Sequence, residues 1–440
     1  MEKETQNEVG QIMMRREIWG LFALIVFTGV FLSVHYVPTF NQAFSTVERL
    51  AGKIPFGWMI RRLHGAGGSL FFLLIVIHLM RTFYTGAYKA RPRAAWVLEV
   101  LLVFTTVSIN FTGSFLPLSQ SAFWGTTTIL SSFSSLPWIG GIAVEFLRGG
   151  KELGGTALIR FYSMHTGFSI LAALFLFIHH RMDRRGKTSG ETVSTNQDLL
   201  SALVITSLLL VIITFAPSWF IDPLKEAANP TVNPERIHLP WYLLFVPETL
   251  PLFSGAYPFG LLAFLVLVLL LLFLLPSLDR NPERRLLLRP FAMALSAAFV
   301  VTGIYFSLIG STHAHYGERV IVPDRTLSAV ELRGAKVFAE KNCAYCHQVT
   351  GKLGRRQGPD LTVVAEHGRS RDWVQRFIYN ARLYQPGTTM PRYEIPLEDL
   401  EALSAYVLSL DRRKETFKAM DPSHLILLYS YSNFQKGGGR

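Results

Sequence analysis

Four histidines lie on two apolar stretches of the chain, two on each. His64 and His78 share one stretch, His165 and His179 the other, and fourteen positions separate the two histidines of each stretch. At about 100° per residue, fourteen steps of an α-helix return to within roughly 40° of the same face. They also climb about 21 Å, most of a hydrocarbon core about 30 Å thick. Two such helices face to face would offer two sites, one above the other. Each would have an imidazole on either side, as a six-coordinate b-type haem requires.

A second set of reactive residues is Cys343-Ala-Tyr-Cys346-His347, which contains both cysteines of the chain. This spacing is the attachment signature of a c-type haem, in which the adjacent histidine becomes the proximal ligand. The segment around Met390 resembles the distal methionine loop of cytochromes c, and a thioether ligand raises the redox potential. Because both cysteines belong to one motif, a disulfide framework and a cysteine-ligated iron–sulfur cluster are excluded within this chain.

Long apolar segments must position these residues. The chain has 440 residues, half of them hydrophobic, which is typical of a membrane bundle with one polar domain. We expect transmembrane helices at about residues 18–37, 63–84, 96–116, 161–181, 199–217, 257–277 and 289–309. The predicted fold is all-α: a seven-span bundle followed by a small α-helical domain.

The formal charge of +12 could suggest nucleic acid as a partner, but the basic residues cluster in short loops at helix ends. This is the positive-inside pattern, which places the amino terminus in the cytoplasm of a bacterium. An odd number of spans then puts everything after residue 310 on the periplasmic side of the inner membrane. No cleavable signal peptide is visible, because the polar start leads directly into a long apolar helix.

The residues around the histidine pairs resemble cytochrome b of the quinol-oxidising bc and b6f complexes. The resemblance covers about residues 28–252 and continues more weakly to about 309. It is carried by Trp58–His64, His78–Arg81, Gly113–Pro117, Phe123–Gly125 and Arg160–His165. It implies a haem-binding four-helix region at 1–190 and a three-helix region with a quinol loop at 191–312. A cytochrome c domain at 313–416 and a tail at 417–440 follow.

The resemblance implies two non-covalent b haems, in addition to one covalent c haem. His64 and His165 would hold the periplasmic-side b haem, and His78 and His179 the cytoplasmic-side one. His180 competes with His179, because bc-type spacing favours His179 and b6f-type spacing, one residue longer, favours His180.

Two arginines accompany the histidine ligands. Arg61 and Arg81 each lie three residues from a ligand and near a membrane face, so each can pair with a haem propionate. Snorkelling of a long cationic side chain towards the headgroups is the alternative.

Glycines match the family around one haem only. Gly29 and Gly113 stand where a missing side chain lets the periplasmic-side porphyrin approach the helix backbone. Fourteen residues earlier the family has two more glycines, and this chain has Arg15 and Glu99. Either the register differs there, or the cytoplasmic-side pocket is built differently.

The quinol loop departs from the family pattern. In Ile237–Phe245, Pro240 stands where the family has a glutamate that takes the quinol proton, and proline cannot act as a general base. Glu248 and His238 are the nearby substitutes, unless both are solvated loop residues. The missing acid favours menaquinol as substrate. The residues expected to bind quinol are Gly125, Pro240, Trp241 and Tyr242, and those expected to assist catalysis are Glu248, His238 and Tyr242.

We therefore expect a fused cytochrome b–c subunit of a quinol:cytochrome c oxidoreductase. One electron would pass through a Rieske iron–sulfur partner to the c haem, and the other would cross the membrane through both b haems. The expected partners are the Rieske protein, quinol and quinone, a soluble or membrane cytochrome c acceptor and a second copy of the chain, with no nucleic acid. The competing expectation is an electron conduit or membrane anchor for a separate dehydrogenase. The missing glutamate favours this rival, whereas Phe123–Gly125 and the Trp241–Tyr242 pair count against it.

Overall fold

The computed structural model describes residues 2–134, 136, 138–150, 153–185, 258–285, 288–312, 320–351, 358–385, 388, 390–421, 423–425 and 428, with short stretches between 204 and 246. The chain divides into two compact units. One contains Met1–Ser119, Gly154–Ala227 and Phe259–Tyr305; the other contains Gln120–Leu153, Ala228–Pro258 and Phe306–Arg440.

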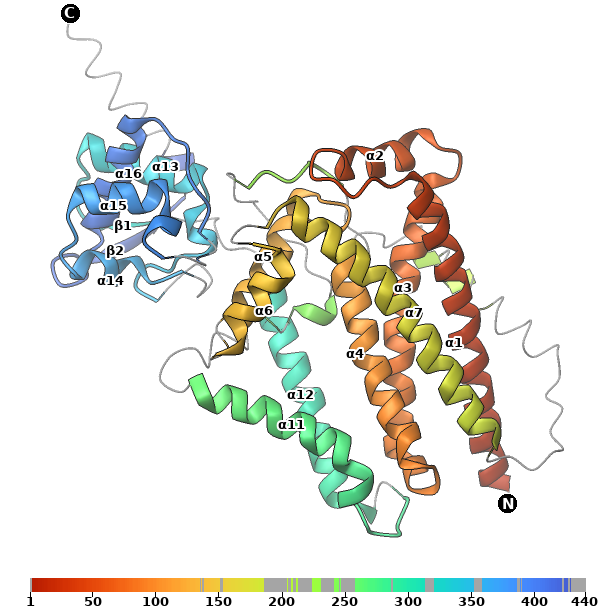
Figure 1. Cartoon of the computed structure of the whole chain (residues 1–440). Coiled ribbons are helices and arrows are strands. Elements are labelled where there is room, and N and C mark those ends of the chain that lie inside the picture. Colours follow the sequence, from red (N-terminus) through yellow and green to blue (C-terminus); the bar gives the residue numbers. More distant parts are fainter. Residues whose placement is uncertain are drawn as a thin grey trace, which may run out of the picture. The chain divides into compact units, whose positions relative to one another are not determined.

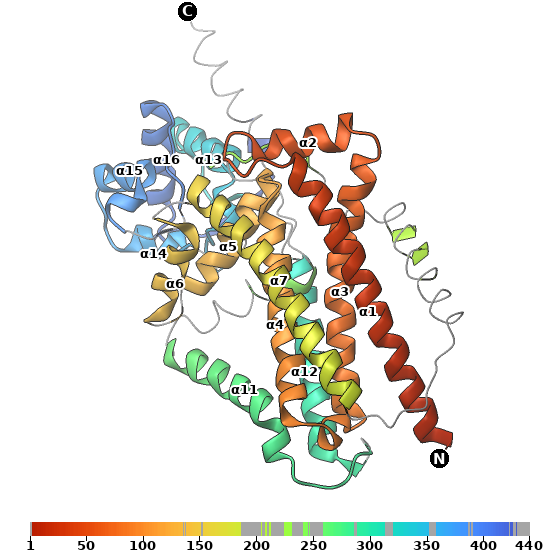
Figure 2. The same ribbon diagram turned by 45° about the vertical axis from the view of Figure 1, so that its right-hand side comes forward.

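Four long helices run side by side in the first unit (Figures 1 and 2). They are α1 (Glu2–His35), α3 (Gly57–Tyr84), α4 (Arg93–Phe115) and α7 (Gly155–Arg185). The short α2 (Ala43–Lys53) lies between α1 and α3, and the turn η1 (Ala87–Ala90) lies between α3 and α4. Each of the four long helices contains a stretch long and apolar enough to cross a membrane: Glu17–His35, Gly57–Tyr84, Arg93–Phe115 and Gly155–Met182. The first four predicted spans are therefore confirmed as such helices.

The other three predicted spans have different outcomes. The helices α11 (Pro258–Leu278) and α12 (Pro290–Thr312) coincide with the sixth and seventh, but their apolar stretches, Val266–Leu278 and Ala292–Tyr305, are shorter. The fifth, 199–217, falls mostly outside the described residues. The expected number of seven spans stays a prediction.

The four long helices pack through a shared apolar core and present apolar side chains outwards. Phe22, Phe71 and Ile75 are buried in that core, whereas Phe27 and Ile170 are exposed. Exposed apolar side chains suit helices surrounded by lipid, because the hydrocarbon demands only that backbone polar groups be bonded within the helix.

A partly buried ion cluster joins α11 and α12 to the turn after α3. Asp279 accepts a hydrogen bond from the Tyr88 hydroxyl, and its carboxylate oxygens lie 3.0 Å from Lys89 Nζ and 3.1 Å from Arg289 Nη2. Arg289 also donates to the Tyr88 hydroxyl at 2.7 Å. Four polar side chains thus satisfy one another, as buried charges require. We call this group the Asp279 cluster.

In the second unit, α5 (Gln120–Ser134) packs against α6 (Ile139–Arg148). The close approach depends on Gly140, since a Cβ there would overlap the backbone carbonyl of Phe133. The turn η2 (Trp241–Leu243) follows in the chain, and its residues Tyr242 and Leu243 are buried.

The carboxy-terminal domain of this unit is mostly helical but contains a small sheet. Its helices and turns are α13 (Ala329–Glu340), η6 (Cys343–Tyr345), α14 (Leu361–Glu366), α15 (Arg371–Tyr379), η7 (Ala381–Leu383) and α16 (Leu397–Ser409). The strands β1 (Val320–Pro323) and β2 (Phe417–Met420) pair antiparallel, with Val320 opposite Met420. The two-stranded sheet departs from the predicted all-α fold.

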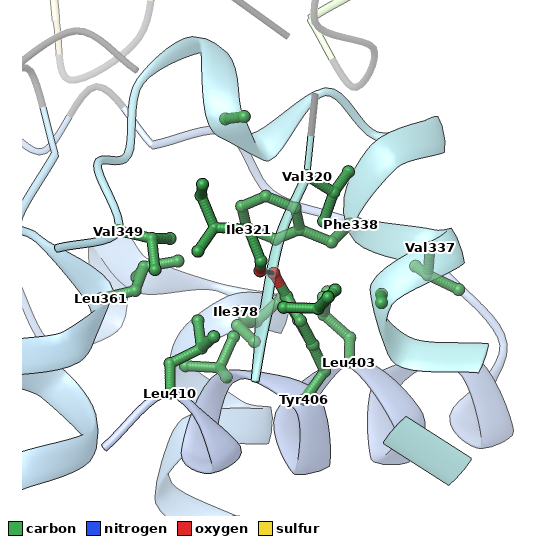
Figure 3. Close-up of a cluster of buried hydrophobic side chains, with 14 of the residues drawn as sticks. Val320, Ile321, Val337, Phe338, Val349, Leu361, Ile378, Leu403, Tyr406 and Leu410 are labelled. Atoms are coloured by element: carbon green, nitrogen blue, oxygen red, sulfur yellow. Dashed lines mark hydrogen bonds between the residues drawn. The ribbon is translucent and has the colours of Figure 1, made fainter. Parts of the chain in front are cut away.

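The core of this domain forms where α13 crosses α16 (Figure 3). Phe338 packs on Tyr406 with ring centroids 5.2 Å apart. The Tyr406 hydroxyl donates to the backbone carbonyl of Ile321 at 2.5 Å. A Cβ at Gly334 would overlap the carbonyl of Ala402, so only glycine permits this crossing. The strand β1 and the two helices are thereby held together.

The amino-terminal end of α13 should make this domain sensitive to acid. Ser328 and Glu331 form a capping box, and the Arg325 guanidinium, followed by the Ser328 groups, lowers the pKa of Glu331 from 4.5 to about 2. The resulting stabilisation of the fold is fully present at a pH above the pKa that Glu331 has in the unfolded chain. It is lost as the pH falls towards about 2, the pKa in the folded chain.

We expect Glu331→Gln to weaken the first turn of α13 at neutral pH and to remove this part of the acid sensitivity. The measurement is hydrogen exchange of the first-turn amides in the full chain, parent against variant at each pH, with α15 as internal reference. Equal protection of α13 in both proteins at neutral pH would contradict the expectation.

Candidate functional site

The first histidine pair, His64 on α3 and His165 on α7, faces across the bundle. The ring centroids lie 6.1 Å apart with an interplanar angle of 67°. Two metal–imidazole bonds of about 2 Å, plus about 1 Å from each nitrogen to its ring centre, span about 6 Å. The separation therefore suits one metal ion between the two rings.

Hydrogen bonds at Nδ1 of His64 and His165 favour the tautomer of each imidazole that can bind a metal through Nε2. His64 Nδ1 lies 3.1 Å from the carbonyl of Ile25 and 3.2 Å from Thr28 Oγ1. His165 Nδ1 lies 2.9 Å from the carbonyl of Ile109. Each Nδ1–H can donate to its carbonyl, which leaves Nε2 unprotonated and free to bind a metal.

Two glycines keep the space beside the first pair open. A Cβ at Gly29 would lie 2.9 Å from His64 Cε1, and one at Gly113 would lie 2.7 Å from His165 Cε1. A flat macrocycle between the rings needs these backbones without side chains. The residues of the first pair therefore fit a b haem. Arg61 and Arg81 are partly buried on α3, and their pairing with propionates stays a prediction.

The second pair, His78 on α3 and His179 on α7, is built differently. The ring centroids are 5.7 Å apart, and both residues are buried. The Glu99 side chain from α4 reaches both rings: its Oε1 lies 2.9 Å from His179 Nε2 and 3.4 Å from His78 Nε2. Arg91 Nη1 lies 3.1 Å from the same oxygen. Glu99 is itself only 2% exposed.

A haem does not fit this second arrangement. Its iron would have to lie between the Nε2 atoms of His78 and His179, and the carboxylate of Glu99 contacts both of those atoms. Glu99 also stands fourteen residues before Gly113, so a side chain occupies the position that is bare in the first pair. The expected second b haem is therefore not supported by this arrangement, and the physical reason is the side chain of Glu99.

The ring of His180 takes a separate direction. It contacts Trp19 edge to face, with centroids 6.3 Å apart, whereas the ring of His179 faces His78. Neighbours on a helix differ by about 100° in direction. Of the two candidates that the sequence left open, the geometry favours His179 as the partner of His78.

The attachment motif in the carboxy-terminal domain forms a single tight turn. The amides of Cys346 and His347 both donate to the carbonyl of Cys343, at 3.2 Å and 3.0 Å. Cys343 and Cys346 form no disulfide, and both are partly buried. His347 Nδ1 lies 2.9 Å from the carbonyl of Pro359, which directs Nε2 away from that bond. Burial lowers the pKa of His347, so the imidazole stays neutral, as a metal ligand must be.

Gly358 completes this site. A Cβ at Gly358 would overlap the ring of His347, so a side chain here would displace the ligand. Asp360 holds the neighbouring turn, since its carboxylate accepts from the amides of Gly351 at 2.6 Å and Thr362 at 3.0 Å. The residues fit a covalently attached c haem. The role of Gly358 could have been suspected only from its place in Gly358-Pro-Asp-Leu.

Met390 is partly buried and packs against the core of the domain. Its amide lies 3.3 Å from Thr388 Oγ1, and residues 386, 387 and 389 lie outside the described part of the chain. Its role as distal ligand stays a prediction.

We expect Met390→His to lower the midpoint potential of the c haem by on the order of 100 mV, because a thioether favours reduced iron and axial ligands set much of the potential. The haem should stay attached through Cys343 and Cys346. The measurement is a redox titration of the full chain at the c-haem absorption band. Met420→His, elsewhere in the same core, is the matched control and should leave the potential unchanged. An unshifted potential in the first variant would assign the distal position to another residue.

The expected quinol residues are only partly described. Gly125 is buried on α5 beside Phe123 and Trp124, and Trp124 Nε1 is buried without a hydrogen-bond partner among the described residues. Tyr242 is buried in η2, and burial raises the pKa of its hydroxyl. His238, Pro240, Glu248 and the side chain of Trp241 lie outside the described residues. Whether these residues line one quinol site stays a prediction.

Three family models match consecutive parts of the chain. The model described as cytochrome b/b6/petB matches residues 9–185, and the one described as cytochrome b (C-terminal)/b6/petD matches residues 227–327. The cytochrome c model matches residues 332–411.

A solved structure described as a hyperthermophilic respiratory Complex III is similar to this chain. The identity is 24% and the TM-score is 0.59, over 68% of this chain and 84% of that chain. At this identity the likeness shows the fold, which agrees with the family matches.

Proposed function

Because this chain is a cytochrome b that carries a carboxy-terminal cytochrome c domain, we propose that it is the quinol-oxidising subunit of a bc-type complex. A role in membrane electron transport follows from the family itself. The finer proposal is that electrons from quinol reach a b haem at His64 and His165 and a c haem at Cys343, Cys346 and His347. The observation that carries it is the first pair, whose ring separation, Nδ1 bonds and bare glycines all suit a b haem.

The residues of the chain have distinct tasks in this proposal. When bound, the haems supply one-electron transfer. His64 and His165 would hold the b haem, and the carbonyls of Ile25 and Ile109 keep those rings oriented. A hydrogen bond from Nδ1–H to a carbonyl also makes the opposite ring nitrogen, Nε2, a more basic ligand.

Quinol must lose protons as it loses electrons, and we propose Glu248 as the acceptor, with His238 as the fallback. This part rests on the sequence, since Pro240 has replaced the usual acid and offers neither a side-chain acceptor nor an N–H. The buried indole N–H of Trp124, beside Gly125 on α5, is a donor that could orient the quinol ring.

The remaining partners follow from what this chain lacks. A Rieske protein is needed because both cysteines belong to the c-haem motif. We propose oxidation of menaquinol at the periplasmic face of a bacterial inner membrane, with the amino terminus in the cytoplasm and the cytochrome c domain in the periplasm. A cytochrome c acceptor and a homodimer complete the proposed assembly.

One rival function has specific support. Pro240 in the quinol loop and Glu99 between His78 and His179 both favour an electron conduit without bifurcation, linking a partner dehydrogenase to the c haem. In that case the b haem and the c haem would be reduced one after the other.

The two functions are separated by stopped-flow absorbance of the purified complex with its native partners, after mixing with reduced menaquinone. Bifurcated oxidation predicts that b and c haems are reduced together, and that removing the Rieske protein stops reduction of the c haem. Sequential reduction that survives removal of the Rieske protein would favour the conduit.

A further inference from the structure

The residues around the second pair have the composition of a metal site without haem. His78, Glu99 and His179 come from α3, α4 and α7, all three are buried, and their candidate ligand atoms lie within 4.8 Å of one another. Two imidazole nitrogens and one carboxylate are a set that divalent iron and zinc both accept. Placement on three packed helices means that the ligands are brought together before any ion binds.

The hydrogen bonding of Glu99 is uneven in a way that points to a missing cation. The nitrogens of His78, His179 and Arg91 all lie within 3.4 Å of Oε1. The other oxygen, Oε2, is buried and has no partner among the described residues. A buried polar atom without a partner is costly, and more so inside a membrane.

A hydrogen-bonded triad without an ion explains this pattern less well. Three donors would crowd one oxygen of Glu99 while the other oxygen had none. A cation near the carboxylate would instead use the nitrogens of His78 and His179 as ligands and give Oε2 the partner that it lacks among the described residues. Arg91 then acts as a positioning residue that holds Oε1 from outside the ligand set.

The surroundings are mostly apolar, which favours tight binding of an ion. Ile18, Ile75, Leu102 and Leu176 line the cavity beside the two rings, together with Trp19 and His180. In so apolar a wall, attraction between an ion and its ligands is much stronger than in water.

We propose that His78, Glu99 and His179 bind one divalent transition-metal ion, Fe²⁺ or Zn²⁺, in place of a second b haem. The site goes beyond the proposed quinol oxidation, which depends on the first pair. Each chain would then hold one b haem, one c haem and one non-haem metal ion.

The first experiment counts metals in the full complex, purified without chelators. Pyridine haemochrome analysis should give one b haem per c haem, and elemental analysis should give about one ion of iron or zinc beyond the haem iron. Excess iron or zinc identifies the ion. Two b haems per c haem, or no metal beyond the haem iron, would overturn the proposal.

The second experiment removes the carboxylate while keeping its shape. Glu99→Gln should lower the affinity for the non-haem metal about 100-fold or more, since even partners of ligands are worth 10- to 100-fold. The b haem at the first pair should remain. Glu48→Gln, an exposed carboxylate on α2, is the matched control and should keep the metal. Full metal content in Glu99→Gln would overturn the assignment.

A third measurement needs no variant and covers the case in which Glu99→Gln does not fold. X-ray absorption at the iron or zinc edge of the parent complex should show nitrogen and oxygen ligands with two imidazoles. If the ion is iron, the haem iron also contributes to the spectrum. Its contribution is measured on complex from which a chelator has removed the ion bound by His78, Glu99 and His179, and is then subtracted. Sulfur ligands or a spectrum without imidazole would overturn the proposal. Failure of the quinol proposal would appear separately, as absent quinol-dependent reduction of the b haem.

Discussion

Replacing Gly113 by valine is expected to remove the b haem from the first pair and to abolish quinol-dependent reduction at this site. A Cβ at this position alone would lie 2.7 Å from His165 Cε1, and valine adds two further methyl groups. The helix itself tolerates the change, because valine is a better helix former than glycine. Pyridine haemochrome analysis should show the loss of b haem with c haem unchanged.

The matched control is Gly167→Val on α7, where an added Cβ meets nothing within 4 Å. It should keep the full b-haem content. Gly29→Val should repeat the loss from the opposite side, because its Cβ would lie 2.9 Å from His64 Cε1. A Gly113→Val protein that retains b haem would show that the macrocycle does not pass this backbone.

Replacing Glu248 by glutamine is expected to slow quinol-dependent reduction of the b haem by about 10²-fold or more, because a general base contributes that much. Glutamine keeps the shape of the side chain and removes its basicity. Stopped-flow absorbance of the b haem, measured across pH, checks both the rate and its pH profile.

Two controls accompany this variant. The b-haem and c-haem contents should be unchanged, and Glu226→Gln, at an exposed carboxylate next to the region that the C-terminal cytochrome b model matches, should react at the parent rate. A parent-like rate and pH profile for Glu248→Gln would leave His238 or water as the proton acceptor.

The helices and the placement of two histidines on one face of each could be predicted because their signals are local. An apolar run of about twenty residues specifies a spanning helix, and a fourteen-residue interval brings two side chains back to one face. Gly29 and Gly113 were identified by the resemblance, and the structure gives the physical reason: a Cβ there would meet the histidine rings.

Features that depend on the meeting of distant segments could not be predicted in this way. The sequence showed that Glu99 stands where a glycine was expected, but not that its carboxylate reaches both His78 and His179. That outcome depends on the packing of three helices. The pairing of β1 with β2 joins two four-residue strands almost one hundred residues apart. Neither strand is long enough to be recognised from its sequence pattern.

The Asp279 cluster has a consequence for biosynthesis. Tyr88 and Lys89 leave the ribosome 191 and 190 residues before Asp279, and Arg289 follows ten residues later. Until α11 and α12 are inserted, Lys89 lacks the carboxylate of Asp279. Once α11 and α12 arrive, the late aspartate and arginine complete the charge balance together. Formation of the cluster thus stabilises a chain in which α11 and α12 are in place relative to a shorter chain that ends before them.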